Sequence, residues 1–519
     1  MDSTILEDMM HRGGSAYFIG IKGSGMCALA ELMHGRGIAV SGSDTREVFY
    51  TDAILKELGI PFHESFDASH IHASELPDGN GMSVRESPPP YSDDSLPDVV
   101  IYSAAYSHES NAEVAQALKL GIPMYKYTDA LGAYSSLFDS SGITGVHGKT
   151  TTTALAGALI KGVGLPAQVL AGSAVSAFGG RSVLNLGAQY FVAETCEYRR
   201  HFLSFCPRRI ILTSVESDHQ DCFPTFNDIK EAFLDYGRRL PPDGELIYCA
   251  DDSGASEVAS VLKKEMPRLQ LVPYGFSAKG DYRIESYEVT DEKAVMRLQS
   301  FPLPLNLRVP GKHTAVNAAA ALALTASLVR KEFGGEADSG WNEARREGAR
   351  KALEEFSGSR RRSEILGEAG GILFMDDYAH HPTAIKTTLA GIKDFYPRRR
   401  LVVSFMSHTY TRTASLLDQF AASFEKADVI VLHKIYASAR EVYSGGVDGR
   451  TLFEKTHQLF GGTSSSDRVL YIDEPDQAAE PLMQILKPGD LFLTMGAGDN
   501  WRLGKKLFDL YCRNVGGAL

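Results

Sequence analysis

The clearest chemical signal in this sequence is the run Gly145, Val146, His147, Gly148, Lys149, Thr150 and Thr151. Backbone N–H groups of a glycine loop, together with the positive end of a following helix, bind phosphate oxygens. In loops of this kind, a lysine at the position of Lys149 contacts the β- and γ-phosphates. A hydroxyl at the position of Thr150 reaches a Mg²⁺ ion that bridges them. Ile143 occupies the place of the strict motif's first glycine. The run predicts an ATP site, and the alternative is a glycine turn before an ordinary helix.

Two apolar segments further along end in residue types that ligate metals. Residues 190–193 lead into Glu194, and residues 209–215 lead to Asp218 and His219. Such runs predict buried strands, and the carboxyl ends of parallel strands meet at one edge of a sheet. We therefore expect these two strand ends to converge with the glycine loop on one Mg·ATP site, although single residues of these types are more often surface groups.

A second glycine turn lies near the start of the chain, between a predicted strand (15–20) and a predicted helix (26–33). Its candidate contacts for a diphosphate are Gly23, Ser24, Gly25 and Met26. The spacing G-x-x-G-x-G differs from the dinucleotide fingerprint but still allows close approach of backbone amides. The next predicted strand (38–44) ends at Asp44, which would hold a ribose or base, or would cap a helix.

The last third of the chain alternates predicted strands with predicted helices. The strands are expected at 371–376, 401–406, 429–433 and 491–494, and the helices near 383–394, 413–426 and 499–511. Polar clusters follow three of these strands, at 376–381, 407–413 and 496–499. In a doubly wound sheet these ends form one crevice, so we expect a ligand there.

Composition limits the class of protein. A chain of 519 residues with 44% hydrophobic residues is too long for one core and predicts about three α/β domains. The formal charge of −12 argues against a nucleic-acid surface. The six cysteines have no paired metal spacing, and no run resembles a membrane span or signal peptide. These features predict a cytoplasmic protein with free thiols.

The expected domains are residues 1–127, 128–350 and 351–519. Within the first domain, residues 75–97 are rich in Ser, Pro, Asp and Glu and predict an inserted surface loop. The charged stretch 334–351 fits a hinge or an exposed helix between domains. Residues 309–317 open an alanine-rich helix, and taken alone they would be only a helix start.

Taken together and in order, these motifs resemble the Mur ligase family of peptidoglycan synthesis. The matching runs are Gly-Val-His-Gly-Lys-Thr-Thr-Thr, Glu-x-x-Glu-Tyr, Glu-Ser-Asp-His, Pro-Gly-Lys-His-x-x-x-Asn, Arg-Arg-Ser-Glu, Asp-Asp-Tyr-Ala-His-His-Pro, His-Thr-Tyr-Thr-Arg-Thr and Gly-Ala-Gly-Asp. The resemblance implies a Rossmann-like UDP-binding domain, a central P-loop-type ATP-binding domain and a Rossmann-like C-terminal domain. It also implies ATP- and Mg²⁺-dependent ligation of a small amino acid, L-alanine foremost, to the lactyl carboxylate of UDP-N-acetylmuramate through an acyl phosphate.

The resemblance assigns expected roles residue by residue. Lys149, His219, Arg362 and Arg412 would act in catalysis, and Thr150, Glu194 and His219 would lie at the metal. Nucleotide contacts would extend beyond the loop to His313, Asn317, Arg362 and Asp377. The substrates would contact Gly23, Ser24, Gly25, Met26, Asp44, His380, His381 and Arg412. Arg412 would hold the carboxylate of the amino acid; the alternative is a surface salt bridge.

Three positions depart from the family pattern. Lys22 replaces a glycine and would contact the diphosphate or face solvent; Thr314 replaces an asparagine near adenine; Ser363 replaces a phenylalanine. Lys230 is the only lysine near the place of a carbamylated lysine in some relatives, and we do not assign it that role. Alternative functions are ligation of a preformed peptide to the same UDP-sugar, as in cell-wall recycling, or a non-catalytic nucleotide-binding regulator. The preferred amino acid and the oligomeric state, monomer or dimer, stay open.

Overall fold

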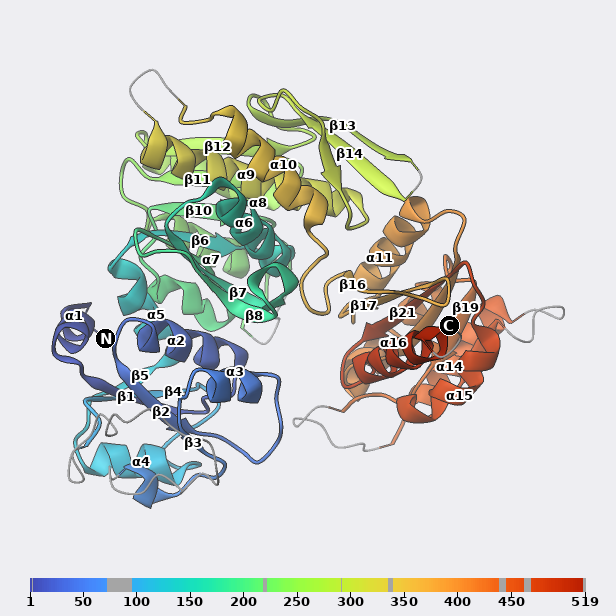
Figure 1. Cartoon of the computed structure of the whole chain (residues 1–519), viewed down its shortest axis with the longest axis horizontal. Coiled ribbons are helices and arrows are strands. Elements are labelled where there is room, and N and C mark those ends of the chain that lie inside the picture. Colours follow the sequence, from blue (N-terminus) through green and yellow to red (C-terminus); the bar gives the residue numbers. More distant parts are fainter. Residues whose placement is uncertain are drawn as a thin grey trace. The chain divides into compact units, whose positions relative to one another are not determined.

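The computed structural model describes residues 1, 3–71, 96–217, 222–290, 292–334, 339–437, 445–461 and 468–516. Its helices and strands form a mixed α/β fold with three largely parallel sheets (Figure 1), which confirms the predicted fold class. The chain folds into two compact units. Unit 1 comprises 1–174, 178–283 and 319–346, and unit 2 comprises 175–177, 284–318 and 347–519.

The first sheet is entirely parallel and has the Rossmann strand order β3-β2-β1-β4-β5. Its strands are β1 (Ser15–Ile19), β2 (Ala39–Ser43), β3 (Phe62–His63), β4 (Val99–Tyr102) and β5 (Met124–Lys126). The helical segments around it are α1 (Ser3–Arg12), α2 (Ser24–His34), α3 (Thr51–Glu57), η1 (Ala68–Ile71), α4 (Ala112–Lys119) and α5 (Tyr127–Ser136). Every residue of β1 is buried, as expected for a central parallel strand. Residues 75–95 of the predicted insertion lie outside the described residues.

The second sheet has ten strands in the order β15-β14-β13-β12-β11-β10-β6-β9-β7-β8. They are β6 (Asp139–Thr144), β7 (Ala167–Val175), β8 (Arg181–Asn185), β9 (Tyr190–Glu194), β10 (Arg209–Leu212), β11 (Glu245–Cys249), β12 (Gln270–Gly275), β13 (Tyr282–Thr290), β14 (Lys293–Leu298) and β15 (Leu305–Leu307). The helical segments are α6 (Lys149–Val163), η2 (Ser176–Phe178), η3 (Tyr198–Ser204), α7 (Phe226–Gly237), α8 (Ser253–Glu265), α9 (Lys312–Phe333) and α10 (Glu343–Glu355). Strands β9, β6 and β10 are adjacent and parallel, so their carboxyl ends share one edge.

The third sheet, in unit 2, has the order β16-β17-β21-β18-β19-β20, and only β16 runs antiparallel to its neighbour. Its strands are β16 (Glu364–Ala369), β17 (Ile372–Asp377), β18 (Arg400–Met406), β19 (Val429–Leu432), β20 (Val469–Tyr471) and β21 (Asp490–Gly496). The helical segments are α11 (Pro382–Phe395), α12 (Tyr410–Ser415), α13 (Leu417–Ala422), α14 (Gly449–Phe460), η4 (Pro475–Ala478), α15 (Ala479–Ile485) and α16 (Trp501–Gly516). The four predicted strands are present.

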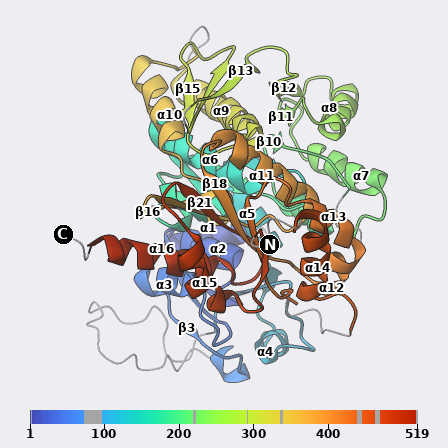
Figure 2. The same ribbon diagram turned by 90° about the vertical axis from the view of Figure 1, so that its right-hand side faces the viewer.

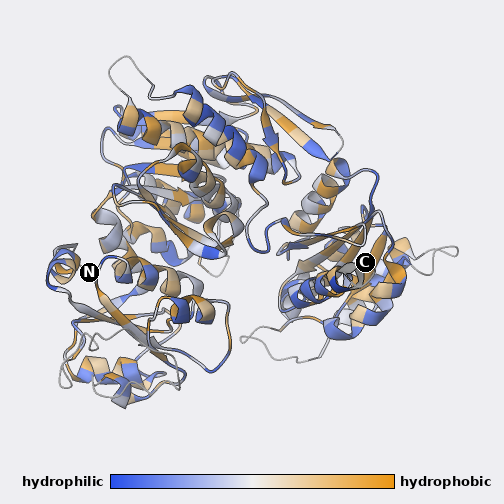
Figure 3. Cartoon of the chain, viewed as in Figure 1, coloured by the Kyte–Doolittle hydropathy of each residue, from blue (hydrophilic) through white to orange (hydrophobic). Residues whose placement is uncertain are grey.

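The single helix predicted over 413–426 is wrong. Two short helices, α12 and α13, replace it, because Leu416 leaves the helical conformation with φ −122° and ψ 21°. Helix α13 packs against α14 (Figure 2). The strands of the sheets are mostly hydrophobic, whereas α16 shows hydrophilic stretches along its length (Figure 3). No helix in the described ranges is long and apolar enough to span a membrane. The domain boundaries near 127 and 350 stay predictions.

Candidate active site

The predicted phosphate loop connects the end of β6 to the start of α6. Gly145 has φ +134°, and a Cβ there would lie 2.1 Å from Thr213 Oγ1, so the loop requires glycine at this position. Gly148 has φ +83° and precedes the first residue of α6. The N–H groups in the first turn of α6 have no acceptor within the helix and are directed toward an incoming anion. The loop therefore has the geometry expected of a phosphate site.

Lys149 begins α6 and folds back over this loop. Its Nζ donates to the carbonyls of Gly145 and Val146, the latter at 3.3 Å. The same Nζ lies 3.0 Å from Glu197 Oε1 and 2.9 Å from Oε2. The Glu197 side chain is 1% exposed and that of Lys149 is 14% exposed. The loop lysine thus has a buried carboxylate partner that sequence reasoning left without a role.

Thr150 and Glu194 form the second contact at the loop. The Thr150 hydroxyl donates to Glu194 Oε1 at 3.1 Å, and the N–H of Gly172 on β7 donates to Oε2 at 2.8 Å. A Cβ at Gly172 would lie 2.5 Å from Oε2, so glycine is needed for this approach. The structure thus brings two of the three predicted metal residues together. The third, His219, lies outside the described residues, as does Asp218.

A cavity in unit 1 is lined by residues near each of the two glycine loops. Gly25, in the first turn of α2, and Glu194 both contribute to its wall. Tyr127 lies between them, because a Cβ on Gly25 would come within 2.9 Å of the Tyr127 ring. Gly23 precedes α2, Ser24 begins it, and Met26 is a buried residue of its first turn. The start of α2 and the end of β9 therefore face one cavity.

Asp44 and Lys22 stabilise the first loop from below. Asp44 is buried, and its carboxylate accepts from the N–H groups of Lys22 at 2.7 Å and Thr45 at 2.8 Å. Lys22 is 1% exposed, and its Nζ lies 2.8 Å from Asp52 Oδ1. The side chain of Lys22 is therefore buried in an ion pair, so the solvent-facing alternative is wrong, and a contact with the diphosphate stays a prediction.

Unit 2 contains a separate cluster of cationic and aromatic side chains. Arg412, in α12, lies with Nη1 3.2 Å from His408 Nδ1. The His408 and His380 rings are 5.8 Å apart, and His380 Nδ1 lies 2.9 Å from the Tyr378 carbonyl. Arg362 stacks 5.5 Å from the centre of the Tyr378 ring. Burial, reinforced by the nearby arginines, lowers the pKa of His380 to about 4, so its imidazole is neutral at pH 7.

Arg412 has no carboxylate ion-pair partner among the residues that the structure describes. The surface salt bridge considered from the sequence is therefore not seen there. Thr409, which precedes α12, has φ +66°, a conformation that β-branched residues rarely adopt. Its N–H donates to the Tyr436 carbonyl at 2.9 Å. This backbone contact fixes the start of the short helix that carries Arg412.

The other predicted residues of unit 2 have protein partners of their own. Asp377 is buried and accepts from the N–H groups of Ser363 at 2.7 Å and Ala379 at 2.8 Å. The Ser363 hydroxyl donates a third hydrogen bond to Asp377 at 3.1 Å. This bond explains why a serine can replace the phenylalanine of the family pattern here. His381 is exposed and caps α11, its Nδ1 accepting from the Thr383 N–H at 3.3 Å.

Residues at the start of α9 also belong to unit 2. His313 packs on Gly311, where φ is +102° and a Cβ would come 2.4 Å from the imidazole Cε1. The Thr314 hydroxyl donates to the Pro310 carbonyl at 2.9 Å, so it stabilises the first turn. Asn317 is buried one turn further along.

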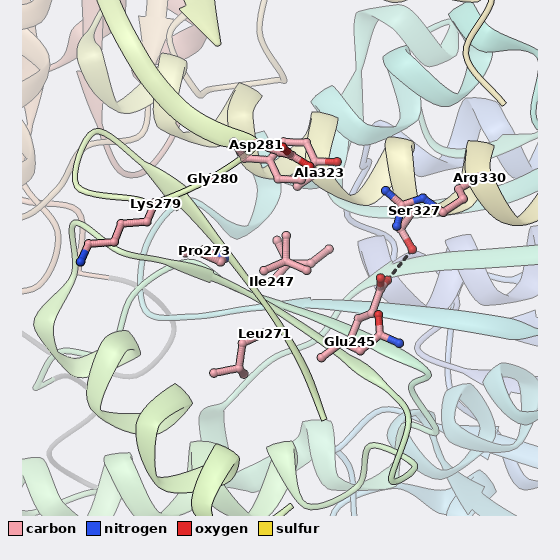
Figure 4. Close-up of a pocket in the computed structure, with 13 residues that line it drawn as sticks. Glu245, Ile247, Leu271, Pro273, Lys279, Gly280, Asp281, Ala323, Ser327 and Arg330 are labelled. Atoms are coloured by element: carbon pink, nitrogen blue, oxygen red, sulfur yellow. Dashed lines mark hydrogen bonds between the residues drawn. The ribbon is translucent and has the colours of Figure 1, made fainter. Parts of the chain in front are cut away.

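A larger cavity, of about 300 Å³, lies elsewhere on the central sheet (Figure 4). Glu245, Ile247, Ser327 and Arg330 line it, and Ser327 donates a hydrogen bond to Glu245. Glu245 is the first residue of β11, so this cavity lies at the amino ends of the parallel strands. The phosphate loop follows the carboxyl end of β6, at the opposite edge. Cavity size alone would therefore misplace the active site.

Two charged residues beside the predicted ones belong to the matched motifs but have no role assigned from the sequence. Glu197 follows Glu194 by three residues, and its motif gave the only available signal. Arg361 precedes Arg362; its guanidinium donates to Asp376 Oδ2 at 3.2 Å and to the Gly498 carbonyl at 2.9 Å. Arg361 has φ +60°, which nothing in the residue pattern indicated.

Comparisons with known proteins match most of the chain to one family. Models of the Mur ligase family match as the catalytic domain over residues 15–139, the middle domain over 143–325 and the glutamate ligase domain over 361–498. The UDP-N-acetylmuramate–L-alanine ligase of Treponema pallidum is 49% identical over 503 residues, covering 97% of this chain and 98% of that protein. That of Borreliella afzelii is 34% identical over 490 residues, covering 94% and 97%.

One solved structure with the same fold is that of the UDP-N-acetylmuramate–alanine ligase of Thermotoga maritima. It superposes with a TM-score of 0.71 at 23% identity, covering 96% of this chain and 99% of that one. At this identity the superposition establishes a shared fold.

Proposed function

Since this chain belongs to the Mur ligase family, we propose that it joins L-alanine to the lactyl carboxylate of UDP-N-acetylmuramate, with ATP as co-substrate. The names of the Treponema and Borreliella relatives support this choice of substrates. One observation carries the proposal: Gly25 of the first glycine loop and Glu194 beside the phosphate loop line the same cavity. A UDP-sugar on the first loop would thereby bring its carboxylate to the ATP phosphates.

The chemistry follows from the poor reactivity of a carboxylate toward amines. In the first step a carboxylate oxygen attacks the γ-phosphorus, the bond to the β-phosphate oxygen breaks, and ADP leaves. In the second step the neutral amine attacks the acyl carbon, the tetrahedral intermediate expels inorganic phosphate, and the amine nitrogen loses a proton. Both steps concentrate negative charge on phosphate and acyl oxygens, so positioned cations and N–H groups supply most of the catalysis.

Lys149 and the first-turn amides of α6 would hold the β- and γ-phosphates, with Gly145, Val146, His147, Gly148 and Thr151 completing the loop. Thr150 and Glu194 offer a hydroxyl and a carboxylate oxygen, the hard donors that Mg²⁺ accepts, and His219 would be the third group. When bound, the ion would neutralise charge on the phosphate oxygens. Arg362, Asp377, His313 and Asn317 are proposed nucleotide contacts, and Asp377 would keep its bonds to Ser363 and Ala379 while doing so.

The amino acid is proposed to bind at the cluster in unit 2. Arg412 has no ion-pair partner among the described residues. Its planar guanidinium group would donate two hydrogen bonds to the α-carboxylate. His380, neutral at pH 7, and His381 would line the same pocket. The diphosphate of the UDP-sugar would be held at the first glycine loop by Gly23, Ser24, Gly25 and Met26. Asp44 would hold this loop in place through its hydrogen bonds to backbone N–H groups, in addition to any contact with the sugar nucleotide.

The direct test is amine-dependent release of phosphate from ATP in the presence of UDP-N-acetylmuramate and Mg²⁺. L-alanine, L-serine, glycine, L-alaninamide and a tripeptide would be compared at equal concentrations. We expect L-alanine to give the highest kcat/KM and Lys149→Ala to give none. Preference for the tripeptide would instead assign the chain to peptide recycling. Absence of amine-dependent release with every amine would favour the non-catalytic regulator.

A further inference from the structure

Lys149 uses all three of its ammonium hydrogens on protein acceptors. These acceptors are two loop carbonyls, from Gly145 and Val146, and the carboxylate of Glu197. An ammonium has three donors, so contact with a phosphate requires at least one of these bonds to be exchanged. The question is which of the three acceptors the lysine gives up.

Burial and charge decide between them. The Glu197 side chain is 1% exposed, and a carboxylate buried to that degree is strongly destabilised without a cationic partner. The carbonyls of Gly145 and Val146 are neutral and lie on the loop itself, so losing a lysine contact is far less unfavourable for them. Lys149 should therefore keep Glu197 and exchange carbonyl oxygens for phosphate oxygens.

The segment that carries Glu197 is rigidly held. The Thr195 N–H donates to the Ile143 carbonyl at 2.9 Å, which ties the end of β9 to β6. Arg199 and Arg200 have φ of +49° and +58°, a left-handed conformation that is unfavourable for non-glycine residues. The N–H of Arg200 donates to the Glu197 carbonyl at 2.8 Å, and the N–H of Phe202 to that of Cys196 at 2.9 Å. Such a strained turn persists only where its surroundings fix it.

We propose that Glu197 is a positioning residue, which fixes the Lys149 ammonium at the phosphate loop before and during phosphoryl transfer. This inference rests on the proposed function for its kinetic consequence. Glu197 would not touch either substrate. It would set where the charge of Lys149 stands when the γ-phosphate moves, and it would leave one or two of the ammonium's donors free for phosphate oxygens.

The test replaces Glu197 by an isosteric neutral side chain. In Glu197→Gln we expect kcat for L-alanine-dependent phosphate release to fall about 10- to 100-fold, the effect of small misplacement of a catalytic group. The Kd for Mg²⁺ and the non-hydrolysable analogue AMP-PNP, measured by calorimetry, should stay the same or become lower, because a negative charge near the phosphates is removed. Glu197→Asp, which keeps the charge, should recover part of the lost kcat.

A second readout does not depend on ligase activity. In the free protein we expect acylation of Lys149 by an amine-reactive reagent, followed by peptide mass spectrometry, to be faster in Glu197→Gln than in the parent. Lys161, exposed at the other end of α6, should react at the same rate in both. Failure of the substrates to turn over in the parent would refute the proposed function but leave this measurement and the AMP-PNP titration standing.

Three outcomes would overturn the inference. One is an unchanged kcat in Glu197→Gln. Another is a fall in kcat matched by an equal weakening of AMP-PNP binding, which would indicate general damage to the loop. The third is an unchanged rate of Lys149 acylation, which would mean that the lysine does not depend on Glu197 for its position.

Discussion

The hydroxyl of Thr150 donates to Glu194 Oε1 at 3.1 Å, although the two residues lie 44 positions apart in the chain. Thr150 belongs to the first turn of α6, and Glu194 ends β9, the strand adjacent to β6. The pair therefore joins the phosphate loop to the next strand end. It places a hydroxyl and a carboxylate oxygen side by side, which are the two groups proposed to bind Mg²⁺.

Removal of this pair should change the dependence on Mg²⁺. In Thr150→Val and in Glu194→Gln we expect the Mg²⁺ concentration for half-maximal activity to rise, because each variant loses one oxygen donor. Thr150→Ser, which keeps the hydroxyl, is the matched control. The measurement is a Mg²⁺ titration of phosphate release at saturating ATP. Titration curves that coincide with the parent's would place the metal elsewhere.

Lys149→Ala should abolish ligation while UDP-N-acetylmuramate still binds. The lost charge stabilises the transferring phosphate, so kcat/KM should fall by at least about 10²- to 10³-fold. Binding of the UDP-sugar, measured by calorimetry without ATP, should not change, because it is proposed to depend on the first glycine loop. Lys161→Ala on the same helix is the control. Parental turnover in Lys149→Ala would remove the phosphate-loop assignment.

Arg412→Ala should act on the amino acid alone. Loss of one charge-assisted carboxylate contact corresponds to roughly 2–4 kcal/mol, or about 30- to 1000-fold in KM for L-alanine. The KM values for ATP and the UDP-sugar should move little. The variant should also lose the parent's preference for L-alanine over L-alaninamide, which lacks the carboxylate charge.

The matched control for that experiment is Arg513→Ala, at an exposed position of α16. If Arg412→Ala retains both the KM for L-alanine and the discrimination against the amide, Arg412 is not the carboxylate clamp. The amino-acid site would then have to be sought among the other side chains of the cluster.

His433 should make the protein less stable in mild acid. Its Nδ1 lies 2.7 Å from the Ile472 carbonyl and its Nε2 2.7 Å from Ser404 Oγ, in a position that is 1% exposed. Burial lowers the pKa of His433 to about 4. Because the unfolded chain takes up a proton near pH 6.5 and the folded chain does not, stability is full above that pH and declines toward pH 4.

Between pH 7.5 and pH 5, protonation linked to His433 should lower the free energy of unfolding by about 2 kcal/mol. Urea unfolding of the parent and of His433→Gln at the two pH values would measure it, because glutamine does not titrate. The variant should be less stable at pH 7.5 but should lose about 2 kcal/mol less on acidification. Equal losses in the two proteins would show that His433 is not buried in its neutral form.

Lys22 should contribute to stability through its buried ion pair. Lys22→Met leaves Asp52 without its cation, which typically costs about 3–5 kcal/mol, whereas Lys22→Met with Asp52→Asn should recover part of that loss. The check is a double-mutant cycle by urea unfolding. Additive effects of the two single substitutions would mean that the two side chains do not interact.

The sequence by itself predicted the α/β fold class, the phosphate loop and most of the residues of the proposed site. A short apolar run followed by a glycine turn predicts β6 and α6, because a glycine loop after a strand typically leads the backbone directly into a helix. Apolar runs likewise predicted β17, β18, β19 and β21. Glu194 and Arg412 stood out as polar residues just past such runs, so their positions at a sheet edge could be expected.

Only the tertiary structure decided which charged side chains face one another. Lys22 lies in the first loop, as expected, but parallel pairing of β1 with β2 and the position of α3 place its ammonium against Asp52. Glu197 contacts Lys149 because β9 lies beside β6, an adjacency that no local pattern encodes. Single-residue conformations such as φ +66° at Thr409 are likewise imposed by surrounding hydrogen bonds. Local propensity fixes the elements, whereas ion pairs and strained turns depend on strand order and burial, which arise only when the whole chain is folded.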